Sequence, residues 1–297
     1  MVDHLMRATA AAGTVRAVII NSTQLAEEAK RRHRLSYVAT AALGRAMTAG
    51  LLLAAGMKRA EARVDLQFKG DGPLGKVWVD AGVDGTVRGY VQHPGIELSP
   101  NKLGKLDVGR AVGRNGLLNV MRDLGYGYPY SGSVELVSGE IGDDVTRYLA
   151  TSEQTPSALL LGVYVDREGV QAAGGLLLQM MPGAPDALID ELEAKLNAAS
   201  GFTPLLRSGQ SLSDILQDIL GDWDLDIAAD THLVRFQCKC NSQRVLGALR
   251  MLGTHELTDM IRTDKGAEAT CHFCSEVYRV SESELTALVR DMAQSGS

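Results

Sequence analysis

The four cysteines of this chain stand in two close pairs, Cys238-Lys239-Cys240 and Cys271-His272-Phe273-Cys274, with thirty residues between the pairs. Zinc prefers four soft ligands in a tetrahedron, and two short-range pairs joined by a folded insert supply them. The sequence therefore predicts one Zn²⁺ ion, bound by the thiolates of Cys238, Cys240, Cys271 and Cys274. His272 is another possible ligand, but the four cysteines already complete the tetrahedron, so we treat it as a neighbour.

The first pair is C-x-C instead of the usual C-x-x-C, so its two thiols share a tighter turn. Thiols this close can also join as a disulfide, which would allow the metal site to act as a thiol switch. The competing interpretation is a closed zinc knot that only folds the end of the chain, as most four-cysteine sites do.

Two physical points favour the switch. A module of about sixty residues buries too little core to fold alone, so its zinc supplies roughly 10 to 16 kcal/mol that is also folding energy. Oxidants convert thiolates to sulfenic acid and then to disulfide, and each step removes ligands from the metal. Oxidation would then unfold the module without any catalytic residue.

Composition favours a soluble globular protein. Of the 297 residues 45% are apolar and 22% charged, which allows one sizeable core plus a smaller module. The longest apolar stretch, residues 46–57, is too short to cross a bilayer, and the N-terminus lacks the core and cleavage site of a signal peptide. We therefore expect a cytoplasmic protein with no membrane partner. In a reducing cytosol, clustered cysteines are typical of metal or redox sites.

The acidic excess is concentrated in one segment. Residues 183–231 carry 2 basic and 10 acidic side chains, whereas residues 232–297 carry 8 of each. A zinc module with balanced charge lacks the basic surface that binds phosphate backbones, so we expect no nucleic-acid partner.

The elements that must position the cysteines follow from periodicity and turn residues. We expect strands at residues 15–20, 63–69, 76–80 and 86–92, a hairpin of residues 158–165 and 170–181, and helices at residues 24–33, 36–57, 140–150, 186–199 and 211–220. The fold class is α+β: an antiparallel-sheet core domain with helices (residues 1–182), a helical linker (183–231) and a small C-terminal zinc-binding domain (232–297).

The predicted linker carries apolar stripes that need a surface to cover. In its second helix the stripe consists of Leu212, Ile215, Leu216, Ile219 and Leu220. A Gly-Phe-Thr-Pro stretch joins the two helices. The pattern fits either a linker docked on a neighbouring domain or an ordinary helical hairpin of the main core, and nothing local decides between them.

Motifs of common enzymes are not convincing. Residues 70–75 match G-x-G-x-x-G, but a strand-like stretch follows instead of the helix that a dinucleotide needs, so we interpret them as a hairpin turn. The histidines are scattered, and His33, among arginines, is expected at a solvated helix end. We predict no catalytic residue and no enzymatic activity.

The chain resembles the 33 kDa chaperonin family, the redox-regulated heat-shock chaperones of bacteria, over nearly its whole length. The resemblance rests on the two cysteine motifs, on VELVSGEI at residues 134–141 and on SEQTPS at residues 152–157. It implies that Cys238, Cys240, Cys271 and Cys274 hold zinc in a reduced, inactive state. It also implies that oxidation forms two disulfides and releases zinc, after which the linker unfolds and homodimers hold unfolding or misfolded client proteins.

Four cysteines allow three pairings, and we favour the two local ones because short loops close at little entropic cost. Gly142 departs from the expected pattern, since it weakens the predicted helix after Glu140. Two other functions remain open. A thiol-disulfide oxidoreductase would need a thioredoxin-like setting around its C-x-x-C, and a structural zinc scaffold would gain no activity on oxidation.

Overall fold

The helix α2 (Tyr37–Ala54) lies between two sheets and is apolar on nearly every side. Ser36 begins it by accepting a hydrogen bond from the Ala39 amide, as N-cap serines do. All its residues except Tyr37 and Arg45 are buried, because it contacts strands of both sheets. In the described chain it is the one helix long and apolar enough to span a membrane, and 89% of it is buried inside the protein.

The structure is a computed structural model that describes residues 2–198 and 201–295. Its contacts divide the chain into two units, Met1–Gln237 and Cys238–Ser297. The mixture of helices with antiparallel sheets confirms the predicted α+β class.

The first sheet of the larger unit has the strand order β10-β1-β2-β9-β8, and β11 also pairs with β1. All of these pairings are antiparallel. The strands are β1 (His4–Ala10), β2 (Val15–Asn21), β8 (Ser157–Asp166), β9 (Gly169–Met180), β10 (Asp226–Ile227) and β11 (His232–Leu233). Strand β1, which has no β-branched run, was not predicted from the sequence. Its pairing with β2 over seven residues makes it a strand, so tertiary context overrides local propensity.

The second sheet has the order β12-β5-β4-β3-β6-β7. It is antiparallel except for the parallel pair of β12 and β5. Its strands are β3 (Arg63–Lys69), β4 (Val77–Gly82), β5 (Thr86–Val91), β6 (Leu117–Asp123), β7 (Tyr130–Glu135) and β12 (Arg235–Phe236). Strands β6 and β7 were not predicted from the sequence either. The predicted meander of residues 63–92 is confirmed, and residues 70–75 connect β3 with β4 as the hairpin expected of them.

Three more helices complete the core: α1 (Thr23–His33), α3 (Val108–Val112) and α4 (Gly142–Thr151). Gly142 is the first residue of α4 and not an interior one, so it weakens the helix little. The buried Asp144 carboxylate accepts hydrogen bonds from the amides of Val137 and Ile141, which fixes the chain before the helix.

His33, at the end of α1, is not simply solvated, because its ring lies edge-on to the Phe236 ring with the two centroids 6.3 Å apart.

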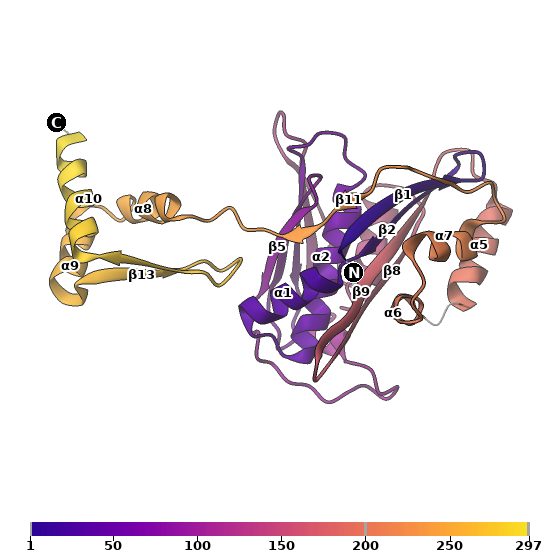
Figure 1. Cartoon of the computed structure of the whole chain (residues 1–297), viewed down its shortest axis with the longest axis horizontal. Helices are drawn as coiled ribbons and strands as arrows, with labels where there is room; N and C mark the ends of the chain where they lie inside the picture. Colours follow the sequence, from indigo (N-terminus) through magenta and orange to yellow (C-terminus); the bar gives the residue numbers. More distant parts are fainter. Residues whose placement is uncertain (1, 199–200, 296–297) are drawn as a thin grey trace. The chain divides into compact units, whose positions relative to one another are not determined.

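The outer face of the first sheet is covered by α5 (Asp186–Ala198), α6 (Phe202–Arg207) and α7 (Leu212–Leu220) (Figure 1). The helix predicted for residues 186–199 ends at Ala198 in the structure, and residue 199 lies outside the described residues. The Gly-Phe-Thr-Pro stretch is not a simple link, since its glycine is the N-cap of α6 and its other three residues form the first turn of that helix. The whole predicted stripe of α7 is buried, against apolar side chains of β1, β2 and β9.

The smaller unit consists of α8 (Ser242–Arg250), α9 (Thr254–Asp264), α10 (Glu282–Ser295) and the hairpin of β13 (Gly266–Thr270) with β14 (Val277–Ser281). Its buried apolar core is small, being formed by Leu249, Leu257, Val280, Leu285 and Leu288. This core alone gives the unit little stability.

Candidate metal centre

The first cysteine pair lies in an extended segment directly before α8. The side chain of Asn241 accepts a hydrogen bond from the Arg244 amide and so caps the helix. Because Asn241 follows Cys240 immediately, the cap fixes the backbone of the second cysteine where the helix begins.

The second pair lies in the turn between β13 and β14. The Cys271 amide donates to the Glu276 carbonyl at 2.9 Å, and the Ser275 amide donates to the Cys271 carbonyl at 2.8 Å. Ser275 has a φ of +58°, which lets the chain reverse directly after Cys274. This tight turn holds Cys271 and Cys274 close together.

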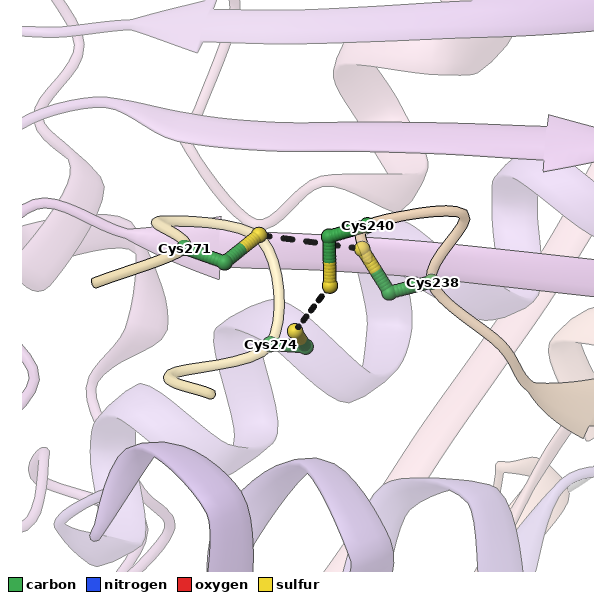
Figure 2. Close-up of side chains that lie close together, drawn as sticks. All are labelled: Cys238, Cys240, Cys271 and Cys274. Carbon is green, nitrogen blue, oxygen red and sulfur yellow. Dashed lines mark hydrogen bonds between the residues drawn. The ribbon is translucent and has the colours of Figure 1, made fainter. Parts of the chain in front are cut away.

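The four sulfur atoms gather around one point (Figure 2). All lie within 4.8 Å of one another, and two hydrogen-bonded pairs each join the two motifs: Cys238 with Cys271 at 3.7 Å and Cys240 with Cys274 at 3.3 Å. A tetrahedron with metal–sulfur bonds of 2.3 Å has edges of roughly 3.8 Å. The donor set therefore fits a tetrahedral metal ion, and none of the four cysteines is joined in a disulfide.

Burial disfavours negatively charged thiolates in this cluster. Cys274 is only 3% exposed, whereas the other three cysteines are half-buried. Burial raises the pKa of the Cys274 thiol and, with a smaller shift, the pKa of the Cys271 thiol. Thiolates are disfavoured in such a place unless a cation offsets their charge, and a bound metal ion supplies that charge.

Tyr278 is a further polar group at the cluster that the sequence analysis missed. Its hydroxyl, on β14, donates a hydrogen bond to the Cys240 sulfur at 3.1 Å. This bond raises the pKa of Tyr278. The sequence feature that could have indicated Tyr278 is its position four residues after Cys274, on the strand that follows the cysteine turn. His272 is exposed and is not part of the four-sulfur cluster.

An open pocket of about 350 Å³ lies beside the cluster. Cys240, Cys271 and Tyr278 line one part of it, and mostly apolar side chains of α8 line another. The pocket therefore brings solvent next to Cys240 and Cys271.

Comparisons with known proteins place the chain in a family. The family model described as "Hsp33 protein" matches residues 3–281. The 33 kDa chaperonin of Rippkaea orientalis is 64% identical over 98% of both chains. That of Synechocystis sp. is 62% identical over 98% of this chain and 97% of its own.

A solved structure agrees with these sequence matches. The crystal structure of the 33 kDa chaperonin from Thermotoga maritima, 35% identical, matches with a TM-score of 0.91 and covers 98% of this chain and 99% of its own. The matches by sequence and by structure both extend over nearly the whole chain, and this protein belongs to the Hsp33 chaperone family.

Proposed function

We propose that this protein is a redox-regulated holdase, a chaperone that binds unfolding proteins under oxidative stress and prevents their aggregation. The observation that carries the proposal is the cluster of four cysteines, with metal-site spacing and no disulfide between them, in a chain of a chaperone family. Cys238, Cys240, Cys271 and Cys274 hold one zinc ion as thiolates in the reduced, inactive state. Bound zinc supplies the folding energy that the small core of residues 238–295 lacks.

Oxidation activates the protein in this proposal. One peroxide molecule takes two electrons from a thiol pair, forms one S–S bond and leaves as two water molecules. Two such events remove all four ligands, so zinc is released. The local pairs Cys238–Cys240 and Cys271–Cys274 stay the favoured disulfides because each closes a very short loop.

The activated form uncovers apolar surface. We divide the chain into a core domain of residues 1–182, a linker of residues 183–231 and a zinc-binding switch domain of residues 232–297. The docking of α5–α7 on the first sheet supports this division, since their release would expose apolar side chains on both partners. Unfolded clients bind there, and the active form is a cytoplasmic homodimer that requires neither nucleic acid nor membrane.

Two alternatives, a thiol-disulfide oxidoreductase and a structural zinc scaffold, predict different results. Cys271 and Cys274 lie in the turn of an antiparallel hairpin, whereas the C-x-x-C of a thioredoxin-like oxidoreductase lies in a βαβ setting. This setting favours the switch over the enzyme.

The deciding experiment measures zinc release and the aggregation of a denatured client, before and after peroxide. Zinc release together with a gain of holding activity supports the proposal. Zinc release without that gain supports the scaffold, and turnover of a disulfide substrate supports the oxidoreductase.

Cys240→Ser is expected to abolish tight zinc binding. The reduced wild type should bind one zinc per chain. Losing a residue that hydrogen-bonds to a metal ligand typically lowers metal affinity 10- to 100-fold, and losing the thiolate ligand itself should lower zinc affinity by more than that. Competition with a chromogenic chelator measures this change. His272→Ala is the matched control and should retain the metal. Loss of zinc in the control alone would contradict the four-thiolate assignment.

Tyr278→Phe is expected to weaken zinc binding by about tenfold, the low end for loss of an outer hydrogen bond. The substitution removes only the hydroxyl that donates to Cys240 and retains the ring. Without this donor the Cys240 thiolate is more nucleophilic, so its alkylation in the zinc-loaded protein should be faster. Unchanged affinity and unchanged alkylation would show that the hydrogen bond does not tune the site.

A further inference from the structure

Residues 226–237, which we call the strap, cover one edge of each sheet in the larger unit (Figure 1). Its strands β10 and β11 pair with β1, and its strand β12 pairs with β5. Without the strap, β1 and β5 would be the outermost strands of their sheets. An edge strand presents unpaired amide and carbonyl groups, which readily pair with another chain.

The strap is held to both edges by short runs of main-chain hydrogen bonds. On the first sheet, the Ala228 amide donates to the Arg7 carbonyl at 2.9 Å and the Val234 amide donates to the Asp3 carbonyl at 3.2 Å. Each of the three strap strands pairs over only two residues. These hydrogen bonds use only backbone atoms, so another extended chain could form them as well.

The contact with β5 follows the same pattern. The Arg235 amide donates to the Gly85 carbonyl at 3.0 Å, and the Gln237 amide donates to the Val87 carbonyl at 2.9 Å. Two apolar side chains at alternate positions add specificity. Val234 is 6% exposed, and the ring of Phe236 lies under the Arg32 guanidinium with 5.3 Å between them.

Gly85 makes room for this passing backbone. A Cβ atom on Gly85 would lie 2.1 Å from the Leu233 carbonyl oxygen, so no side chain fits there while the strap is in place. The edge of β5 is therefore shaped to receive an extended main chain.

We propose that β1 and β5, once the strap has left, pair with extended segments of unfolding client proteins by strand addition. The inference rests on the proposed function, because loss of zinc is the event that releases the strap. The favoured segments have free backbone amides, hence little proline, and apolar side chains at alternate positions, as Val234 and Phe236 are placed. Two edges in one molecule allow two segments of a client to bind together and so increase its residence time.

A synthetic peptide of residues 224–237 tests the pairing at β5, with full-length oxidised protein as the receptor. The matched control is the same peptide N-methylated at Arg235 and Gln237, which lacks the two donors but keeps all side chains. The unmodified peptide should bind the oxidised protein, compete with a denatured client and bind at least tenfold more tightly than the control. Equal binding of the two peptides, or binding that leaves client holding unchanged, would overturn the proposal.

Hydrogen exchange tests client binding directly. Adding a denatured client to the oxidised protein should slow exchange in residues 3–10 and 85–91. Slowing confined to the face that α5–α7 cover would contradict the inference. Without any client, exchange protection of these edges that increases with protein concentration would show that they pair with a second copy of the chain. That result would also contradict the inference.

Gly85→Ala supplies a matched pair with Gly104→Ala. Both glycines have positive φ, +75° and +70°, but only a Cβ at Gly85 meets another chain segment. In the reduced protein Gly85→Ala should speed exchange of the strap, and in the oxidised protein it should weaken binding of the peptide at least threefold. Gly104→Ala should do neither, and equal effects of the two substitutions would overturn the role of the β5 edge.

The inference and the proposed function can fail separately. If the oxidised wild type holds no client, redox activation is wrong. The double variant Val234→Ser with Phe236→Ser then loosens the strap at β5 in the reduced protein, and peptide binding there still supports the β5 edge as a site. If the oxidised wild type holds clients while neither form binds the peptide, only the edge inference is wrong.

Discussion

Replacing Leu216 and Ile219 by serine should allow the reduced, zinc-loaded protein to suppress aggregation of a heat-denatured client. Both side chains are buried in the cluster between α7 and the first sheet, Leu216 fully and Ile219 to 92%, since 8% is exposed. Burial of each side chain contributes about 1.5 to 3 kcal/mol to the free energy of docking α7 on the sheet, so the double substitution removes roughly 3 to 6 kcal/mol. A nine-residue helix has little stability without such packing. The linker should therefore open with its thiols untouched.

The matched control places two serines on the exposed face of the same helix, as Gln217→Ser with Asp218→Ser. This variant should stay inactive while reduced, and oxidised wild type sets the upper reference. Hydrogen exchange reports opening of α7 separately from activity. If the buried pair opens the linker and the protein stays inactive, exposure alone does not create the chaperone surface and oxidation contributes something more.

Oxidation with zinc release should abolish exchange protection in residues 238–295 and loosen α5–α7, while residues 13–181 stay folded. The smaller unit has five buried apolar side chains in its core, and the larger unit has two extensive clusters over its sheets. Structural zinc contributes roughly 10 to 16 kcal/mol in such small modules, more than the total stability of many domains. Its loss should therefore unfold the smaller unit completely.

Hydrogen exchange before and after peroxide measures this effect segment by segment. Reduction followed by addition of zinc should restore protection in residues 238–295, which separates unfolding by metal loss from irreversible damage. Protection lost first near Val77 or Val163, in the strands of the two sheets, would contradict a core that is independent of the metal.

Most of the core architecture was predictable because its signals are local. The buried helix α2, the meander from β3 to β5 and the hairpin of β8 with β9 show period, length and turn residues in the sequence itself. Strand β1 was missed because only its pairing with β2 defines it. Helix α6 was missed for a similar reason, since it is short and contacts β8 and β9.

The cysteine cluster was also predictable only in part. The identity and spacing of the four cysteines were sufficient to predict that their thiols converge, and the structure brings all four sulfur atoms within 4.8 Å of one another. The hydrogen bond from Tyr278 to Cys240 was not predictable, because it depends on where β14 lies relative to the segment before α8.

The sequence by itself determined the soft-ligand chemistry of the site, the α+β class and the apolar stripe of α7, because each depends on residue type and on spacing along one segment. Only the tertiary structure decided what the stripe covers, which groups surround the sulfur atoms and how residues 226–237 cover one edge of each sheet. These features join segments far apart in the chain. Contacts of this kind depend on how whole elements pack, and no local pattern of residues encodes them.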